Sequence, residues 1–196
     1  MYDTHFHPAS PVNSYALGAA YVHMQQNGIQ PAEYCERGAL SMVTAPRVVL
    51  EETLAALLLR EPGGAVVITS GRSRDRVFVE IAKRRPGTSV ICSGSPSQLR
   101  NSVRACNASL IIVVHDPEWY EHDEESAART AAMLREYAWS CANRMAILAR
   151  PGDAHLDVMW PYAGRYLYIE HEGERKNGRT TNDCQLTLDA GGDASG

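Results

Sequence analysis

The stretch Ser109–Val114, which reads SLIIVV, decides the fold class of this chain. An unbroken apolar run rich in β-branched residues, with no polar alternation, is typical of a strand covered on both faces of a parallel sheet. Runs of the same kind occur at Ala65–Thr69 (AVVIT), Ser89–Cys92 (SVIC) and Met145–Ala149 (MAILA), and a shorter one, Ala39–Val43, precedes them. The sequence therefore predicts a central sheet of mainly parallel strands.

Helical patterns separate these strands. The expected helices are Arg47–Arg60, Asp75–Arg85, Ser97–Cys106 and Glu124–Asn143. The first is apolar on most faces and should be largely buried, while acidic residues crowd the first turn of the last, where the helix dipole favours them. Because strands that alternate with helices form βαβ units, we expect a three-layer αβα domain.

The two ends of the chain carry other patterns than its centre. Ser14–Gln26 has apolar residues at helical spacings, which predicts a helix within an N-terminal helical extension, residues 1–35. The core is expected to span residues 36–189. The small, polar tail 190–196 is expected to be disordered.

A hairpin is expected to close the core. Arg165–Glu170 (RYLYIE) and Cys184–Leu188 (CQLTL) alternate in the manner of half-buried strands, and Asn177-Gly178 between them is a turn signal. We therefore expect a C-terminal antiparallel hairpin at the edge of the otherwise parallel sheet.

Composition bounds the class of protein. With 196 residues, 44% of them apolar, and a net charge of −4, the chain fits one globular domain without a global attraction to nucleic acid or to an anionic membrane. No apolar run reaches the ~18 residues of a membrane span, and the first residues do not read as a signal peptide. The five cysteines are far apart and form no C-x-x-C pair, which is typical of reduced thiols. We expect a cytoplasmic protein that does not contact the membrane.

Six segments, taken in order, carry a resemblance to a known family. They are Glu36–Val43, Val66–Thr69, Leu110–Val114, Met133–Ala138, Trp160–Ile169 and Gln185–Gly191. The order of these segments and their residue patterns resemble the core of RecA-type recombinases, most nearly the archaeal RadA and RadB proteins, over residues 36–191. The resemblance implies a RecA-like P-loop NTPase core, self-association and a setting in DNA recombination or repair.

The turn after the first strand departs from that family. A phosphate-binding loop needs G-x-x-x-x-G-K-[ST], in which glycines bring backbone N–H groups to the phosphates and the lysine neutralises them. Thr44-Ala45-Pro46-Arg47 has no glycine and no lysine, and Ser70-Gly71 stands where the family carries its catalytic glutamate. His115-Asp116 follows the strand that resembles the Walker B strand, so the magnesium-side acid is displaced by one residue.

The resemblance therefore implies a degenerate nucleotide site, made of Thr44, Arg47, His115 and Asp116. We expect no ATP hydrolysis and no cofactor. The expected function is that of a catalytically inactive paralog, a binding or regulatory module in DNA repair or recombination. It would act with a protein partner or with copies of itself.

Basic and aromatic residues give this module a candidate nucleic-acid surface. Arginine can contact a phosphate while an aromatic ring stacks on a base. The candidate contacts are Arg72, Arg74, Arg150, Trp160, Arg175 and Lys176. The same residues also fit an ordinary solvated surface, and the sequence leaves both interpretations open.

A function of a different class comes from the first residues. Asp3, His5 and His7 form a D-x-H-x-H pattern that resembles the first metal-binding strand of TatD-like amidohydrolases. Alternate residues of a strand share a face, so the two imidazoles could hold one metal ion. The alternative function is therefore a metal-dependent hydrolase, although an eight-fold barrel usually takes ~250 residues.

Overall fold

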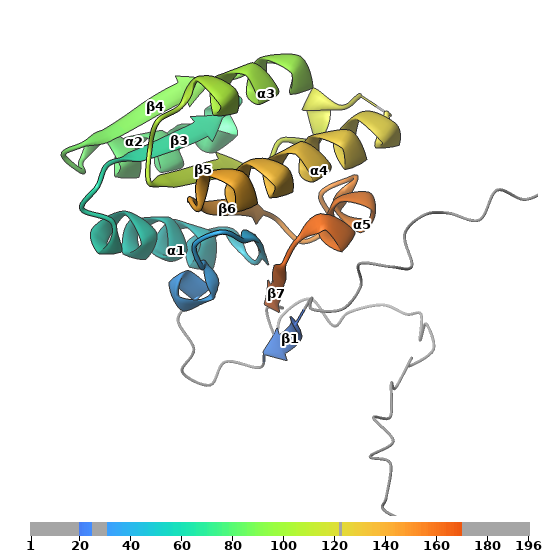
Figure 1. The fold of residues 1–196 in the computed structure, drawn as a ribbon, viewed down its shortest axis with the longest axis horizontal. Coiled ribbons are helices and arrows are strands. Elements are labelled where there is room, and N and C mark those ends of the chain that lie inside the picture. The colour runs from blue at the N-terminus through green and yellow to red at the C-terminus, as the bar shows by residue number, and fades with distance from the viewer. Residues whose placement is uncertain (1–19, 25–30, 122, 170–196) are drawn as a thin grey trace, which may run out of the picture.

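One seven-stranded sheet runs through the middle of the molecule, with its strands in the order β1-β7-β2-β6-β5-β3-β4 (Figure 1). The computed structural model describes residues 20–24, 31–121 and 123–169. The strands are β1 (Ala20–Met24), β2 (Leu40–Thr44), β3 (Ala65–Thr69), β4 (Thr88–Cys92), β5 (Leu110–Val114), β6 (Arg144–Ala149) and β7 (Arg165–Ile169). Every pairing of neighbouring strands in these ranges is parallel.

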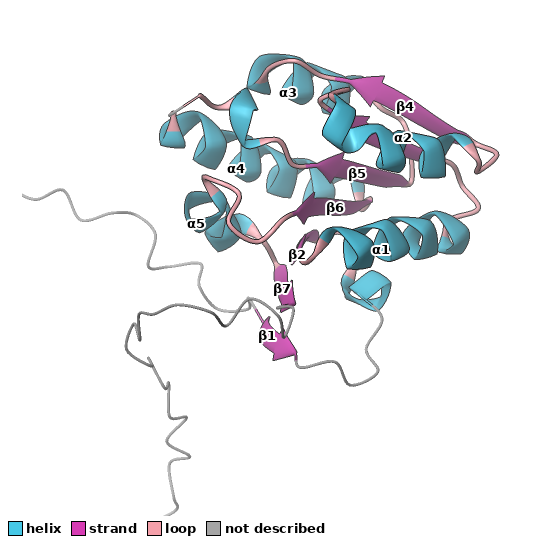
Figure 2. Cartoon of the chain, turned by 180° about the vertical axis from the view of Figure 1, so that it is seen from behind, coloured by secondary structure: helices cyan, strands magenta, loops and turns pink. Residues whose placement is uncertain are grey.

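Helices cover both faces of the sheet. They are α1 (Arg47–Arg60), α2 (Arg76–Lys83), α3 (Pro96–Ala105), α4 (Glu124–Cys141) and α5 (Leu156–Met159), and the short 3-10 helices are η2 (Pro31–Tyr34), η3 (Ser73–Asp75), η4 (Pro117–Trp119) and η5 (Trp160–Tyr162). α1 and α2 pack on one face, which Figure 2 turns toward the viewer, and α3, α4 and α5 pack on the other.

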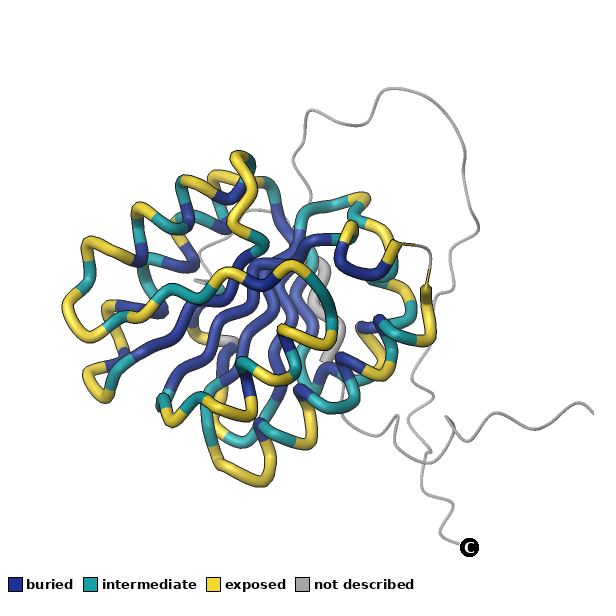
Figure 3. Tube along the Cα trace, turned by 90° about the horizontal axis from the view of Figure 1, so that it is seen from above, coloured by how far each residue is buried: buried dark blue, intermediate teal, exposed yellow. Residues whose placement is uncertain are grey.

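Strand β5, inside the sheet, contributes side chains to both hydrophobic layers. Ile111 and Val113 pack with α3 and α4, whereas Leu110, Ile112 and Val114 pack with α1 and α2. All five residues are buried, because each face of the strand is covered by a helix layer. Figure 3 shows the strands as a buried core between helices whose outer turns are exposed. The three-layer α/β architecture with a parallel sheet, expected from the sequence, is confirmed.

The expected core helices are present with ends within two residues of their predicted bounds, and α1 and β3 begin and end where expected. Local signals fix several of these ends. The hydroxyl of Ser95 accepts a hydrogen bond from Gln98 N at 3.3 Å and caps α3, and Asp123 accepts one from Ser126 N at 2.8 Å and caps α4. α1 differs, since it follows Pro46 without a side-chain cap.

The segment Ala20–Met24 corrects one expectation. It forms β1, an edge strand parallel to β7 with Val22 opposite Leu167, so the helix expected over Ser14–Gln26 is wrong for these residues. Tyrosine and valine favour extended backbone, and the edge of β7 offers main-chain hydrogen bonds that the spacing of apolar residues does not reveal. The rest of residues 1–30 lies outside the described ranges.

The C-terminal part of the core is described up to β7. The strand expected at Arg165–Glu170 is present, and its neighbours β1 and β2 are both parallel to it. Cys184–Leu188, the second strand of the expected antiparallel hairpin, lies outside the described residues, as does the tail 190–196. Within the described part of the chain, no helix combines the length and the apolar character needed to cross a membrane.

Candidate functional site

The connections place a set of polar loops at the carboxyl ends of β3, β5 and β6. The helices that follow β2 and β3, α1 and α2, pack on one face of the sheet. The helices that follow β4 and β5, α3 and α4, pack on the other face. β3 and β5 are neighbours, yet the helices that follow them leave toward opposite faces. In open α/β sheets, this reversal creates the crevice in which ligands bind.

Three arginines and three carboxylates gather at this reversal. They form the acid–arginine cluster, whose members are Arg72, Arg74, Asp75, Asp116, Glu118 and Arg150. Asp75 follows β3 and Asp116 follows β5, and the side chains of both are completely buried. The arginine side chains are only partly buried and reach these acids from the loops around them.

Asp116 is the centre of the cluster. One of its carboxylate oxygens pairs with Arg74 Nη2, and the other lies 3.5 Å from Arg72 Nε. The oxygen that pairs with Arg74 also accepts a hydrogen bond from Glu118 N at 3.0 Å, which starts η4. Arg72 pairs with the Glu118 carboxylate as well. The acid that follows β5 is therefore engaged by two guanidinium groups of its own chain.

Asp75 ties the loop after β3 to the loop after β6. It accepts hydrogen bonds from Ser70 Oγ at 2.5 Å and from Ser70 N at 3.3 Å, and its other oxygen lies 3.6 Å from Arg150 Nη2. Arg150 Nη2 also donates to the carbonyl of Arg74 at 3.2 Å. The cluster thus links three loops that are distant in sequence, through two buried carboxylates and partly exposed guanidinium groups.

The cluster is balanced in charge but not fully hydrogen-bonded. Arg74 Nε, Asp75 Oδ1 and Asp116 Oδ2 are buried atoms without a hydrogen-bond partner among the described residues. Their nearest charged contacts are ion pairs at 3.5–3.9 Å, longer than a good hydrogen bond. Loss of one arginine would leave a buried carboxylate undercompensated, which is costly in a protein interior.

His115, next to Asp116, pairs with Asp153 and not with the acid–arginine cluster. Its Nδ1 lies 3.3 Å from Asp153 Oδ2, which also accepts a hydrogen bond from Arg150 N at 2.9 Å. Burial alone would raise the pKa of Asp153, but the hydrogen bonds from His115 and Arg150, with their positive charges, outweigh it and lower the pKa. The imidazole of His115 is buried and stacks on Tyr120, with ring centroids 5.9 Å apart. Burial raises the pKa of Tyr120 above its usual range.

The four residues of the expected degenerate nucleotide site share the carboxyl edge but do not form one site. Thr44 is level with Ala149 on the neighbouring strand, and its buried hydroxyl has no hydrogen-bond partner among the described residues. Arg47 lies on α1 and pairs with Glu51, one turn further on, at 2.7 Å. No described contact joins Thr44 or Arg47 to the side chains of His115 and Asp116.

The candidate nucleic-acid residues fall into separate groups. Arg72, Arg74 and Arg150 meet in the acid–arginine cluster, whereas Trp160 stacks on Tyr166, with ring centroids 6.2 Å apart. The remaining candidates, Arg175 and Lys176, and the residues of the alternative metal site, Asp3, His5 and His7, lie outside the described residues.

Sequence reasoning missed two acids, the buried Asp75 and the half-buried Asp153. Both stand in loops just after strands, which is the one signal the sequence offered, but Arg150 is 75 positions from Asp75 and His115 is 38 positions from Asp153. Among the described residues, no group of three or more histidine, cysteine, aspartate or glutamate side chains is placed to hold a metal ion.

Comparisons with known proteins give a structural likeness and no match in sequence. The chain matches no protein-family model and no curated protein. Among solved structures, it is similar to the crystal structure of the RadB recombinase, with a TM-score of 0.44 and 12% sequence identity, over 70% of this chain and 77% of that chain.

Proposed function

We propose that this chain is a catalytically inactive module with the RecA-like order of elements, which acts by binding and regulates or assists a partner. The observation that carries the proposal is the state of Asp116. This acid follows the strand that resembles the Walker B strand, and it is buried and paired with Arg72 and Arg74. It has neither the exposure nor the free charge that a magnesium ion would require.

The rest of the expected nucleotide site supports the same proposal. ATP hydrolysis depends on backbone N–H groups and a lysine around the phosphates, together with a bound metal. The turn from Thr44 to Arg47 supplies neither glycine nor lysine, and the guanidinium of Arg47 is held by Glu51. The residues present therefore do not fit Mg²⁺-ATP, and we assign no step of a reaction to them.

The partner that the cluster favours is a protein. Arg72, Arg74 and Arg150 each contact an acid, so three guanidinium groups face three carboxylates and leave no surplus positive charge. Binding of a nucleic-acid backbone depends on such a surplus. By the resemblance of sequence order, we propose DNA recombination or repair as the setting, with this chain as a protein-binding partner or as a subunit of a homo-oligomer.

Calorimetric titration with Mg²⁺-ATP tests the loss of nucleotide binding. We expect no saturable heat at millimolar nucleotide for the wild type. Micromolar affinity that disappears in Arg47→Ala, but persists in Arg104→Ala on α3, would contradict the proposal because the turn would then still hold phosphate.

Fluorescence anisotropy with a single-stranded oligonucleotide tests the choice of partner. At low salt, we expect no more than weak binding, equal in the wild type and in Arg150→Ala. Tight binding that Arg150→Ala reduces, and that Arg104→Ala leaves unchanged, would make nucleic acid the partner.

Metal analysis separates the proposal from the hydrolase alternative. Protein purified without a histidine tag should contain far less than one equivalent of zinc or manganese. A stoichiometric metal that is lost in a His5→Ala, His7→Ala double variant would favour the metal-dependent hydrolase instead.

A further inference from the structure

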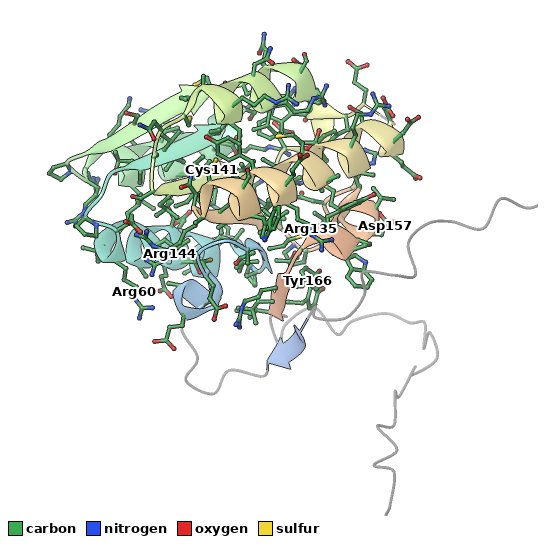
Figure 4. All side chains as sticks on the ribbon, viewed as in Figure 1. Arg60, Arg135, Cys141, Arg144, Asp157 and Tyr166 are labelled. Atoms are coloured by element: carbon green, nitrogen blue, oxygen red, sulfur yellow. The ribbon has the colours of Figure 1, made fainter. Side chains whose placement is uncertain are left out.

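A surface hollow of about 510 Å³ lies beside the acid–arginine cluster, between the loop after β6, helix α5 and strand β7. We call it the aromatic–acidic hollow. The residues that give it its chemistry are Asp153, His155, Asp157, Trp160, Tyr166 and Tyr168. Figure 4 shows Asp157 on α5 and Tyr166 on β7 on the same side of the molecule.

Aromatic rings form one wall of the hollow. Trp160 stacks on Tyr166 with an angle of 27° between the ring planes, and 42% of Trp160 is exposed. Tyr166 and Tyr168 are alternate residues of β7, so both side chains point to the face that carries α4 and α5. Tyr166 is buried and Tyr168 half-buried, so Trp160 is the ring that this wall exposes, and a large exposed aromatic ring beside a hollow is characteristic of recognition sites.

Carboxylates supply the charge of the hollow. Asp153 and Asp157 line it, and no lysine or arginine does. Two arginines on adjoining elements are engaged elsewhere. Arg150 Nη2 contacts Asp75 and the carbonyl of Arg74, and Arg165 pairs with Glu36 at 2.5 Å. Asp153 is already paired with His115 and the backbone N–H of Arg150, whereas Asp157 is exposed and forms no ion pair among the described residues. Asp157 therefore gives the hollow an uncompensated negative charge.

The loop that carries the acids has a fixed conformation. Asp153 Oδ2 is held by Arg150 N and lies near His115 Nδ1, which leaves the carboxylate little freedom to turn away. His155 adopts a positive φ of 69°, a conformation that side chains rarely take. Such backbone persists where the surrounding structure over-determines it, often at ligand sites.

We propose that the aromatic–acidic hollow binds the guanidinium group of an arginine side chain, presented by a basic peptide segment of a protein partner. Aromatic faces attract cations, and guanidinium combines charge with a planar surface that stacks on such rings. The rim of the hollow, which includes Gly152 and Ala154, is exposed, so a peptide backbone can lie across it. The inference rests on the proposed binding function and names the chemistry of its partner.

The test compares two peptides that differ in charge alone. Acetyl-Gly-Gly-Arg-Gly-Gly-amide and the same peptide with neutral citrulline in place of arginine are titrated into the full chain, and binding is followed by the NMR signal of the Trp160 indole N–H, assigned with Trp160→Phe. We expect the arginine peptide to bind at least about tenfold more tightly than the citrulline peptide. Equal affinity for the two peptides would overturn the proposal.

Variants locate the binding to the hollow. Calorimetric titration, which does not depend on the Trp160 signal, compares the variants: Asp157→Asn should weaken the binding of the arginine peptide about three- to fivefold, and Trp160→Ala should weaken it further. The matched control is Glu52→Gln, an exposed acid on α1 at the opposite face of the sheet, which should bind as the wild type does. An unchanged affinity in both Asp157→Asn and Trp160→Ala would place the cation elsewhere and overturn the assignment.

Free N-acetyl-arginine amide distinguishes a peptide from a small cation. We expect it to bind more weakly than the peptide, and equal affinity would overturn the proposal that the guanidinium group is presented by a peptide.

If the arginine peptide does not bind, the proposed function still stands, since that proposal depends on the absence of Mg²⁺-ATP binding, which is measured separately.

Discussion

The acid–arginine cluster and the aromatic–acidic hollow lie at the carboxyl edge of one sheet but differ in how the charges of their carboxylates are compensated. In the cluster, the buried Asp75 and Asp116 are compensated by arginines of the same chain. In the hollow, Asp153 and Asp157 lie beside aromatic rings and no cationic side chain lines the cavity. A buried carboxylate requires a cation within the fold, whereas a carboxylate at the surface can remain charged in water and accept a cation from outside. The comparison indicates which part of the edge stabilises the loops and which part is open to a ligand.

One residue connects the two regions. The side chain of Arg150 enters the cluster, while its backbone N–H holds Asp153 at the hollow. The cluster can therefore position the loop that carries the acids of the hollow. The following predictions separate the structural role of the cluster from the binding role of the hollow.

The largest effect on stability is expected for Arg74→Ala. The variant leaves Asp116 buried with only the more distant Arg72 in support, so we expect the free energy of unfolding to fall by about 3 kcal/mol. Urea denaturation measures it, with Arg104→Ala as a control that should stay within about 0.5 kcal/mol of the wild type. Adding Asp116→Asn should recover part of the loss, because it removes the uncompensated charge. Strictly additive losses would show that the two side chains are not coupled.

A smaller effect, with a defined pH dependence, is expected for Asp153→Asn. Burial opposes ionisation of Asp153, but hydrogen bonds from His115 and Arg150 lower its pKa below the ordinary 3.8 in the folded state. The charged group therefore stabilises the fold above that ordinary value, and its contribution disappears as the pH falls through the lower folded-state pKa. We expect a loss of about 1.5 kcal/mol at pH 7 that shrinks below pH 3.8. A difference that stays constant in urea denaturation from pH 7 to pH 3 would contradict this role.

Trp160→Ala should affect stability less than it affects binding. Loss of the stacking on Tyr166 should cost about 1 kcal/mol of unfolding free energy, since Trp160 is partly exposed. Trp160→Phe should restore most of that stability. Thermal unfolding measures the cost, and a loss as large as that of Arg74→Ala would mean that the ring belongs to the structural core and not to a recognition surface.

The smallest effect on stability is expected for Asp157→Asn. Asp157 is exposed in the first turn of the short helix α5, so the change in unfolding free energy should be about 0.3 kcal/mol or less. The same variant should nevertheless reduce the preference for the arginine peptide over the citrulline peptide. Unchanged stability together with an unchanged preference would leave the hollow without a functional carboxylate at this position.

Much of the fold could be predicted from local patterns. The apolar run at residues 109–114 is buried on both faces, and α1 and β3 have the predicted bounds, because strong periodicity and clear breakers mark them. Ala20–Met24 was misread as helix, since the edge of β7 decides its conformation through hydrogen bonds from a distant part of the chain. Local spacing contains no information about such a partner.

Several members of the candidate site could be predicted from the sequence, but their pairing could not. Arg72, Arg74 and Asp116 were each singled out from the sequence, as a nucleic-acid surface and as a nucleotide site, and the structure joins them in one ion-pair cluster. Asp75, which completes the cluster with Arg150, had no distinguishing motif. Pairing depends on which loops follow neighbouring strands, and that neighbourhood is set by the strand order.

The alternation of strands and helices, the burial of the core strands and the lack of a G-x-x-x-x-G-K-[ST] pattern can all be read from residues close together in the chain. Folding in three dimensions is what brings arginines from the loop after β3 to the acid after β5, and what stacks Trp160 on Tyr166 beside two acids. Parallel strands bring their carboxyl ends to one edge of the sheet, so residues tens of positions apart become neighbours there. Charge balance at that edge is a property of those neighbours, and it distinguishes the closed cluster from the open hollow.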